Sequence, residues 1–505
     1  MTFIERPLPR LSKPAVRKAL DEARADFEWC WKTFHGGGDL SADDGTRGVD
    51  LLSYQARLVK AVWNLERFIR AIKKAKLPLE SDPGRYNRAY RKARLKALAS
   101  YDHALRECVG TGRALGDAFA WIFYERDREL ISEHLKEQMQ AMLPQGVGGF
   151  GERLLTESMK SLDGRLLLYH GITSFLRIGD VSFVDVESMR VHAIGEVKTK
   201  DAGENKLEIG VHMVAAEMAH LPRPPVQPSV KRQSVVQPLP PLLEERLGRQ
   251  KKRMGAVMQA SRKALEETAA IAGEMPFYFD ELAKAVQQSR VGRMELVPAG
   301  PAMVIGVIRC RKGTSICGLS KTSGDLNKVL ADVPAQATGI LVSGWSDNSI
   351  WLDDATSADK FVVTDESLPP GWWPLEPEVL HDILFGQVMV ITIYNPAHLS
   401  HLLEGQGFSR RTVNGKELFE RRLDNGRLLQ LQNMTYFHRF VTRSFMSLDG
   451  VLKMILQGID ATLAQGQNYT GPGQFKAKIM PKITTSRAAS RRSPLPRNQD
   501  GSVSK

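Results

Sequence analysis

Two short segments rich in β-branched residues carry acidic and basic side chains at a spacing suited to binding a metal ion. The first begins at Asp180, and the second contains Glu196 and Lys198 on either side of Val197. Side chains of a strand alternate between its two faces, so Glu196 and Lys198 point the same way. If the segments form a hairpin centred near residue 188, Asp180 lies opposite Glu196, with their Cβ atoms about 5 Å apart.

Two carboxylates at that distance repel each other unless a positive charge lies between them. Mg²⁺ suits such a pair, because it takes carboxylate oxygens and keeps several of its waters. Lys198 would reach the same pocket, where its ammonium group would orient a metal-bound water or help to deprotonate it. Water activated in this way attacks phosphodiesters, so the pattern predicts metal-dependent hydrolysis of a phosphodiester bond.

The order of these acids resembles the PD-(D/E)xK nuclease superfamily, the fold of many restriction enzymes and Holliday-junction resolvases. The family pattern is an acid at the start of one strand and Glu-x-Lys on the next, here Asp180, Glu196 and Lys198. Gly179 stands where the family name has proline, a position that is loosely kept in the family. The resemblance implies that Asp180 and Glu196 bind Mg²⁺, which Mn²⁺ could replace, and that Lys198 positions the attacking water.

The resemblance also implies a third acid and an order of elements. Family members often carry a glutamate on the helix before the first strand, for which Glu152 is the better candidate and Glu157 the other. The implied order is this helix, three strands, and then a helix and a strand at about 242–267 and 302–308 that complete the sheet. The long proline-rich insertion 203–241 departs from the family pattern.

The Glu-x-Lys spacing is a weak signal by itself, because a chain of this length contains it by chance. A second copy at 204–206 lies in a polar stretch and is set aside for that reason. The strand context, the hairpin midpoint and the upstream glutamates carry the argument. Two alternatives stay open: an ordinary β-hairpin with solvated charges, and a non-catalytic copy of the nuclease fold. His192 shares the face of Glu196, but a structural role fits it better than a metal contact.

Pattern and composition divide the chain into four parts. We expect an α/β multidomain protein with a helical N-terminal domain, a central restriction-endonuclease-like mixed sheet flanked by helices, a C-terminal α/β domain and a disordered basic tail. The predicted boundaries are 1–145, 146–355 including the insertion 203–241, 356–467 and 468–505.

Apolar spacing gives the expected elements in more detail. The N-terminal helices are predicted around 58–72, from 86 past 104, and from 116 to 142. The C-terminal part is predicted to hold a strand at 388–394, a hairpin over 417–431 and a final helix after 449. The glycines from 146 to 151 satisfy GxGxxG, but no strand precedes them, so they predict a joint between domains rather than a nucleotide site.

Positive charge exceeds negative charge, with 70 Lys and Arg against 57 Asp and Glu and a net charge of +13. Such an excess is typical of proteins with an acidic partner, most often nucleic acid, although a merely basic protein is the alternative. Two basic stretches and the tail could neutralise phosphates, or be solvated surface. The candidate DNA-binding residues are Arg85, Arg88, Arg91 and Lys92 in one stretch, and Arg249, Gln250, Lys252 and Arg253 in the other, where Gln250 follows from the family resemblance.

Several other classes of protein are excluded by what the sequence lacks. Four cysteines without a CxxC pair do not make a disulfide scaffold or a zinc site, and they indicate a reducing compartment. No apolar run approaches the roughly 18 residues of a membrane span, and the first residues lack the apolar core of a signal peptide. No GxxxxGK[ST] motif supports ATP-driven translocation. We expect a cytoplasmic protein without a membrane partner.

These patterns together predict a Mg²⁺-dependent endonuclease that acts on DNA. Restriction or anti-phage defence is suggested by analogy alone. The N-terminal and C-terminal parts would select the substrate or bind protein partners, and no oligomeric state is predicted. The alternatives are a non-catalytic DNA-binding or scaffold component of a larger nucleoprotein assembly, and a protein-interaction component without affinity for nucleic acid.

Overall fold

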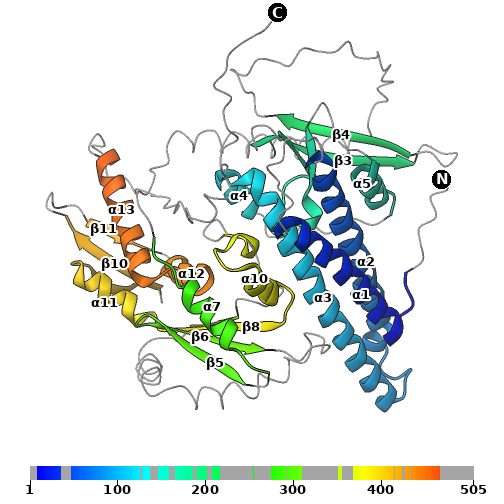
Figure 1. Ribbon diagram of the computed structural model, residues 1–505, viewed down its shortest axis with the longest axis horizontal. Coiled ribbons are helices and arrows are strands. Elements are labelled where there is room, and N and C mark those ends of the chain that lie inside the picture. The colour runs from blue at the N-terminus through cyan, green and yellow to red at the C-terminus, as the bar shows by residue number, and fades with distance from the viewer. Residues whose placement is uncertain are drawn as a thin grey trace, which may run out of the picture. The chain divides into compact units, whose positions relative to one another are not determined.

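A computed structural model shows helices at the N-terminal side of the chain and three small antiparallel sheets after them, among the residues that it describes (Figure 1). No helix in these residues is long and apolar enough to cross a membrane. The described residues are 8–35, 47–125, 128–136, 146–158, 165–185, 190–201, 207–215, 254, 275–291, 293–309, 351–354, 368–413, 416–423, 426, 428–432 and 434–466.

The chain forms two compact units, and each is assembled from segments that are distant in sequence. The first unit comprises Met1–Pro7, Gly48–Val59 and Phe119–Glu267, and the second comprises Leu8–Arg47, Lys60–Ala118 and Thr268–Lys505. The helical region expected over 1–145 therefore contributes residues to both units.

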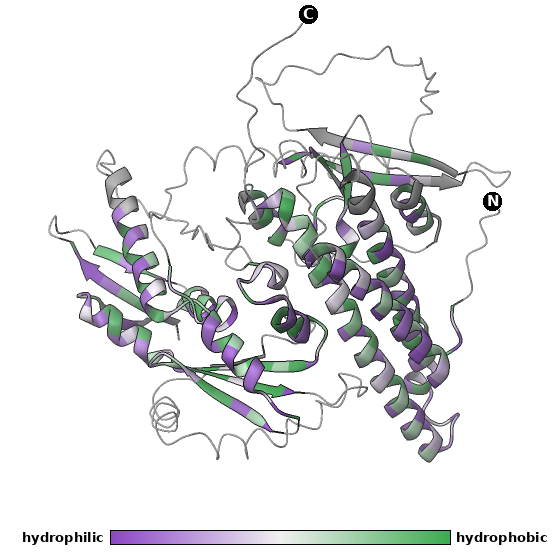
Figure 2. Ribbon diagram, viewed as in Figure 1, coloured by the Kyte–Doolittle hydropathy of each residue, from purple (hydrophilic) through white to green (hydrophobic). Residues whose placement is uncertain are grey.

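Long helices make up the described N-terminal region. They are α1 (Lys13–His35), α2 (Arg47–Ser81), α3 (Arg88–Tyr124) and the shorter α4 (Arg128–Leu135). The apolar stripe predicted around 58–72 lies in α2, where Leu58, Val62 and Leu65 are fully buried. Figure 2 shows the alternation of hydrophobic and hydrophilic residues along these helices, which is typical of amphipathic helices.

Helix α3 is continuous where two separate helices were expected, and this corrects the prediction of a break between 104 and 116. Gly112 in this stretch serves close packing rather than termination of the helix. A Cβ atom at Gly112 would lie 2.5 Å from the Phe27 ring and 2.9 Å from Val62. Glycine thus lets α3 lie directly against α1 and α2.

The first unit holds a four-stranded sheet and the helix that precedes it. The elements are α5 (Gly146–Ser158), β1 (Leu166–Tyr169), the 3₁₀ turn η1 (His170–Ile172), β2 (Val181–Asp185), β3 (Arg190–Asp201) and β4 (Leu207–Ala215). The strands pair in the order β1-β2-β3-β4, each antiparallel to its neighbour. The predicted order of one helix followed by three strands is confirmed.

Three expectations for this region are wrong. The glycines from 146 to 151 lie inside α5 and are not a joint between domains. Residues 207–215, expected within the insertion, form β4 and pair along β3. The described sheet is antiparallel throughout rather than mixed, because a connection as short as 202–206 can only return the chain antiparallel, whereas a parallel strand needs a long crossover.

A second sheet, in the second unit, contains the strand that was expected to complete the first one. Its elements are α7 (Phe279–Gln288), β5 (Met294–Ala299), β6 (Met303–Arg309), β7 (Trp351–Asp354), η3 (Pro370–Trp372), α10 (Pro377–Leu384) and β8 (Val388–Tyr394). The order is β5-β6-β8-β7. The predicted strand at 302–308 is therefore β6, and its apolar side chains are buried against β8 rather than in the first unit. The strand at 388–394 is confirmed as β8.

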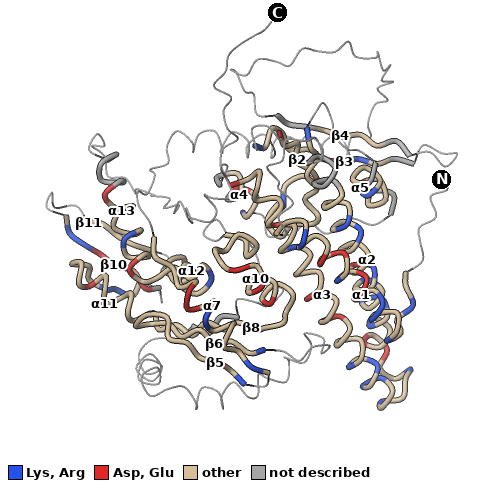
Figure 3. Tube along the Cα trace, in the orientation of Figure 1, with Lys and Arg blue, Asp and Glu red and all other residues tan. Residues whose placement is uncertain are grey.

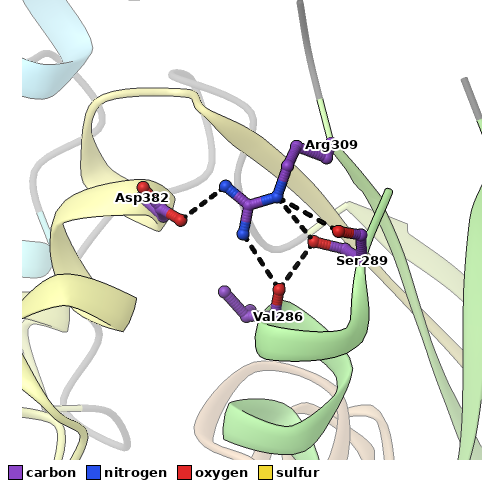
Figure 4. A network of polar contacts seen from close by, with 4 residues as sticks. All are labelled: Val286, Ser289, Arg309 and Asp382. Atoms are coloured by element: carbon purple, nitrogen blue, oxygen red, sulfur yellow. Dashed lines mark hydrogen bonds and ion pairs between the residues drawn. The ribbon is translucent and has the colours of Figure 1, made fainter. Parts of the chain in front are cut away.

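Arg309 at the end of β6 ties two helices to this sheet (Figure 4). Its guanidinium group donates to the carbonyl of Val286 at 3.0 Å and to Ser289, at the carboxyl end of α7, and it forms an ion pair with Asp382 of α10 at 2.7 Å. A cation is favourable at a helix carboxyl end, where carbonyl groups lack helical partners. The second sheet and two of its helices are thus joined through one side chain.

The remaining described elements follow β8. They are α11 (Ala397–Gly405), β9 (Ser409–Val413), β10 (Lys416–Arg422), β11 (Leu428–Leu431), α12 (Met434–Ser444) and α13 (Leu448–Gly466). The hairpin predicted over 417–431 is confirmed as β10 and β11, and the final helix is confirmed as α13. The tail 468–505 and, apart from Met254, the predicted helix 242–267 lie outside the described residues.

Candidate active site

Asp180 enters β2 opposite Glu196 of β3, as the hairpin midpoint predicted. Val181 pairs with Gly195, and the Asp180 N–H donates to the Gly195 carbonyl at 2.9 Å. Asp180 Oδ2 accepts the backbone N–H of Val197 at 2.8 Å, which fixes the carboxylate against β3. The register therefore brings the two predicted acids side by side.

Gly179 explains why this chain has no proline before the acid. Its φ of 73° lies in the left-handed region, which residues with a Cβ atom avoid. A Cβ atom there would also lie 2.7 Å from Ile194 Cγ2 and 2.8 Å from the Gly195 carbonyl oxygen. The glycine allows the chain to turn into β2 in close contact with β3, and this turn delivers Asp180.

Lys198 lies beside Glu196 on the same face of β3. Its Nζ is 2.5 Å from Glu196 Oε1, and the two side chains are 26% and 10% exposed. Both residues follow from the alternation of side chains along one strand. The pair places an ammonium group at the edge of a mostly buried carboxylate, where the ammonium group is still exposed in part to solvent.

Helix α5 brings Glu152 to the same cluster. Gly151 is buried against β3, and a Cβ atom there would lie 1.9 Å from Thr199 Oγ1. Only glycine permits this approach, so the residue that seemed to mark a joint in fact seats the helix on the sheet. The Tyr169 hydroxyl donates to Glu152 Oε2, and Glu152 is 6% exposed.

The electrostatics of the cluster show that the acids interact. Burial, followed by the charge of Asp180, raises the pKa of Glu152 to about 8, against the hydrogen bond from Tyr169 and the charge of Lys198. Burial and the charge of Glu196 raise the pKa of Asp180 to about 7, against the Val197 N–H and Lys198. One ammonium group does not balance the negative charge of three carboxylates. Two of these acids, Glu152 and Asp180, therefore keep protons near neutral pH.

The donor set of the cluster fits a hard divalent cation, since all three acids offer carboxylate oxygens. In the described parts of the chain, however, no three His, Cys, Asp or Glu side chains lie close enough to hold a metal ion as they stand. Binding of Mg²⁺ at this cluster would therefore need a rearrangement of its carboxylates. A cation between them would relieve the repulsion that helps to raise the pKa of Asp180.

A buried network of polar side chains supports the turn before Asp180. His170 Nδ1 donates to the Gly179 carbonyl at 3.1 Å, so its Nε2 accepts the Ser182 hydroxyl at 2.6 Å. The Tyr124 hydroxyl in turn lies 2.5 Å from Ser182 Oγ. Because Ser182 and His170 are completely buried, this pair does not act as a nucleophile and base on a substrate. It holds the backbone that carries Asp180.

Gln55 of α2 completes the outer edge of the sheet. Its side-chain amide donates to the Leu167 carbonyl at 2.8 Å and accepts the Tyr169 N–H at 2.8 Å. One amide thus replaces a neighbouring strand for β1, and it satisfies two backbone groups that burial would otherwise leave unpaired. The same contacts fix Tyr169, which holds Glu152.

The other predicted site residues are placed as follows. Glu157 belongs to α5, but its side chain lies outside the described residues. His192 lies half-buried on β3, and the charged groups that act on its pKa are Arg165 and Asp185 rather than the acids of the cluster. The candidate DNA-binding residues Arg85, Arg88, Arg91 and Lys92 lie in the second unit, whereas Arg249, Gln250, Lys252 and Arg253 lie outside the described residues.

Sequence reasoning missed two residues that position the cluster. Tyr169 ends the short apolar run 166–169, which indicates no more than a strand, but a tyrosine that ends such a run has a hydroxyl that needs a partner when buried. Gln55 carried no local signal, since its contact with Tyr169 spans 114 residues of sequence.

Comparisons with protein-family models, with curated proteins and with solved structures find no match to this chain.

Proposed function

We propose that this chain is a Mg²⁺-dependent endonuclease that hydrolyses phosphodiester bonds of DNA. The observation that carries the proposal is the cluster of Asp180, Glu196 and Lys198 on adjacent strands, with Glu152 beside it on α5. This is the arrangement that the resemblance to PD-(D/E)xK nucleases implies. The analogy with restriction enzymes also suggests a role in defence against foreign DNA.

Each residue of the cluster has a separate task in this proposal. Asp180 and Glu196 bind Mg²⁺, which supplies Lewis-acid activation of the phosphodiester and of water when bound. Lys198 donates a hydrogen bond to the attacking water and orients it, since its ammonium group lies beside Glu196. Glu152 supports the ion through water, and Tyr169 holds its carboxylate in place.

The experiment is cleavage of supercoiled plasmid by the purified chain in Mg²⁺, in Mn²⁺ and in EDTA. We expect nicking that needs metal and that is lost in Glu196→Ala and in Lys198→Ala. Glu295→Ala, which removes a half-buried glutamate from β5 of the other unit, is the matched control and should cleave like the wild type. Equal cleavage by the wild type and both site variants would show that the assigned site is wrong.

A non-catalytic DNA-binding or scaffold protein is the second candidate. It is favoured by the ion pair that already occupies Glu196 and by the lack, within the described residues, of three groups close enough to hold a metal ion. This candidate predicts DNA binding that persists in EDTA and no cleavage in either metal. The same plasmid assay, combined with a binding measurement in EDTA, separates the two candidates.

A further inference from the structure

The tip of the hairpin formed by α2 and α3 combines exposed cations with tyrosine rings. This tip surface lies in the second unit, and Figure 3 shows the Lys and Arg positions along it in blue. It is defined here as Arg85, Tyr86, Arg88, Tyr90, Lys92 and Lys96, all of which are exposed except the half-buried Tyr86.

Local hydrogen bonds give the tip a defined conformation. Asn87 Oδ1 accepts the Ala89 N–H at 2.9 Å and the Asn87 carbonyl accepts the Arg91 N–H at 2.9 Å, so Asn87 caps the start of α3. Arg91 Nε donates to the Leu79 carbonyl at 2.6 Å, which joins the end of α2 to α3. The side chain of Arg91 therefore serves the turn, and its neighbours face outward.

The tip surface carries four cations, and the exposed acids of the same turn, Glu80 and Asp82, form no ion pair with them. Within the described residues none of them takes part in an ion pair. Elsewhere in this unit exposed cations do have acidic neighbours one helical turn away, as Arg17 has Asp21 and Lys18 has Glu22. Cations left without a counter-charge on the protein favour an anionic partner.

The aromatic rings indicate which anionic partner fits. Tyr86 and Tyr90 are stacked, with ring centroids 6.2 Å apart and planes inclined by 29°. Tyr90 is nevertheless 55% exposed, which leaves much of its ring open to a further planar group. Arg85 lies over the Tyr86 ring, with its Cζ 5.9 Å from the ring centroid, so a cation also contacts the stacked pair.

Helix geometry sets the Tyr90 ring apart from the Lys92 ammonium group on the surface of α3. At about 100° per residue, Tyr90 and Lys92 project to opposite flanks of the exposed face of α3. Ala89 and Ala93, both exposed, lie between them and leave room for a chain close to the helix. A backbone laid across this face would meet cations on one side and a ring on the other.

We propose that the tip surface binds single-stranded nucleic acid. Bases stack on Tyr90, and the cations bind the phosphates on either side of the stacked base. Single strands are preferred because the bases of a duplex have no free faces for stacking. This inference rests on the proposed function for nucleic acid as the partner, and it adds a strand preference and a place that the cluster around Asp180 does not provide.

The test is fluorescence anisotropy of labelled oligothymidylate with the full chain in EDTA, so that no cleavage is needed. Tyr90→Ala should weaken binding between about 5-fold and 150-fold, whereas Tyr90→Phe, which keeps the ring, should bind like the wild type. The double variant Lys92→Ala, Lys96→Ala should bind more weakly and lower the slope of log affinity against log salt by about 1.4. Lys284→Ala with Arg290→Ala removes two exposed cations at α7 as the matched control and should leave both quantities unchanged.

Several results would overturn the inference. The first is that Tyr90→Ala binds oligothymidylate as tightly as the wild type. The second is that the chain binds a duplex more tightly than a single strand of equal length. The third is that the tip variants lose binding to phosphatidylserine vesicles but keep binding to oligothymidylate. A chain that binds the single strand through the tip but never cleaves would refute the proposed function alone. A chain that cleaves plasmid, but whose tip variants bind oligothymidylate like the wild type, would refute this inference alone.

Discussion

Binding of Mg²⁺ to the candidate site should release protons, in a number that depends on pH. The raised pKa values of about 8 for Glu152 and about 7 for Asp180 mean that the metal-free site keeps protons near neutrality. A carboxylate must be ionised to bind the metal. Because the two acids titrate as a coupled pair, binding should release on the order of one proton at pH 7 and close to none at pH 9.

The same values fix the sign of the pH dependence of affinity. Because protons compete with the metal, affinity should rise with pH, and at pH 7 it should be on the order of tenfold weaker than well above pH 8. Isothermal titration calorimetry of the full chain, in two buffers with different ionisation enthalpies, gives the number of protons released. Glu152→Gln should lower this number at pH 7, and Glu295→Gln should leave it unchanged.

Two results would refute this reasoning. A proton release near zero at pH 7 would show that the acids are ionised in the metal-free protein, contrary to their burial and mutual repulsion. A release that is the same at pH 7 and pH 9 would show that other groups supply the protons. A chain that binds no Mg²⁺ at either pH would refute the metal site itself.

Three further predictions concern the elements that position the site and the second sheet. Gly151→Ala should lower the free energy of unfolding of the first unit by about 1–3 kcal/mol, because the added methyl group overpacks the contact with Thr199. Hydrogen exchange of the β3 amides measures this loss, and Thr199→Gly in the same chain should restore most of it. Gln55→Leu leaves two buried backbone groups of β1 unpaired, so β1 amides should exchange faster, by a loss of about 2–4 kcal/mol; unchanged exchange would contradict the role of Gln55. Arg309→Met should lower the melting temperature of the second unit through a loss of about 1–3 kcal/mol, and Asp382→Asn, which keeps the shape of the partner, should lower it less.

The opposition of Asp180 and Glu196 was predictable because an antiparallel hairpin leaves little freedom. Once the turn is placed, the register follows, and alternation places Lys198 on the face of Glu196. The pattern of acids therefore translated directly into geometry. It could not show that Lys198 pairs with Glu196, since that contact depends on side-chain conformation within a buried cluster.

Long-range contacts could not be predicted from local pattern. An apolar strand such as the one predicted at 302–308 fits any sheet with a buried face. Only the packing of the whole chain determines that this strand, β6, pairs with β8. The glycines near 146 have the composition of a flexible joint, yet Gly151 is required by Thr199, which lies on a strand far along the chain. Local composition does not distinguish a glycine that frees the backbone from one that admits a neighbour.

The interleaving of the two units along the chain has a consequence for the order in which the protein folds during synthesis. The helical part of the second unit ends at Ala118, but the rest of that unit begins only at Thr268. At typical rates of translation the ribosome needs roughly 10–30 s to make the intervening residues. During that interval the segments that pack against these helices have not been made, so part of their apolar surface stays exposed. We expect chaperones to bind this exposed surface on the nascent chain.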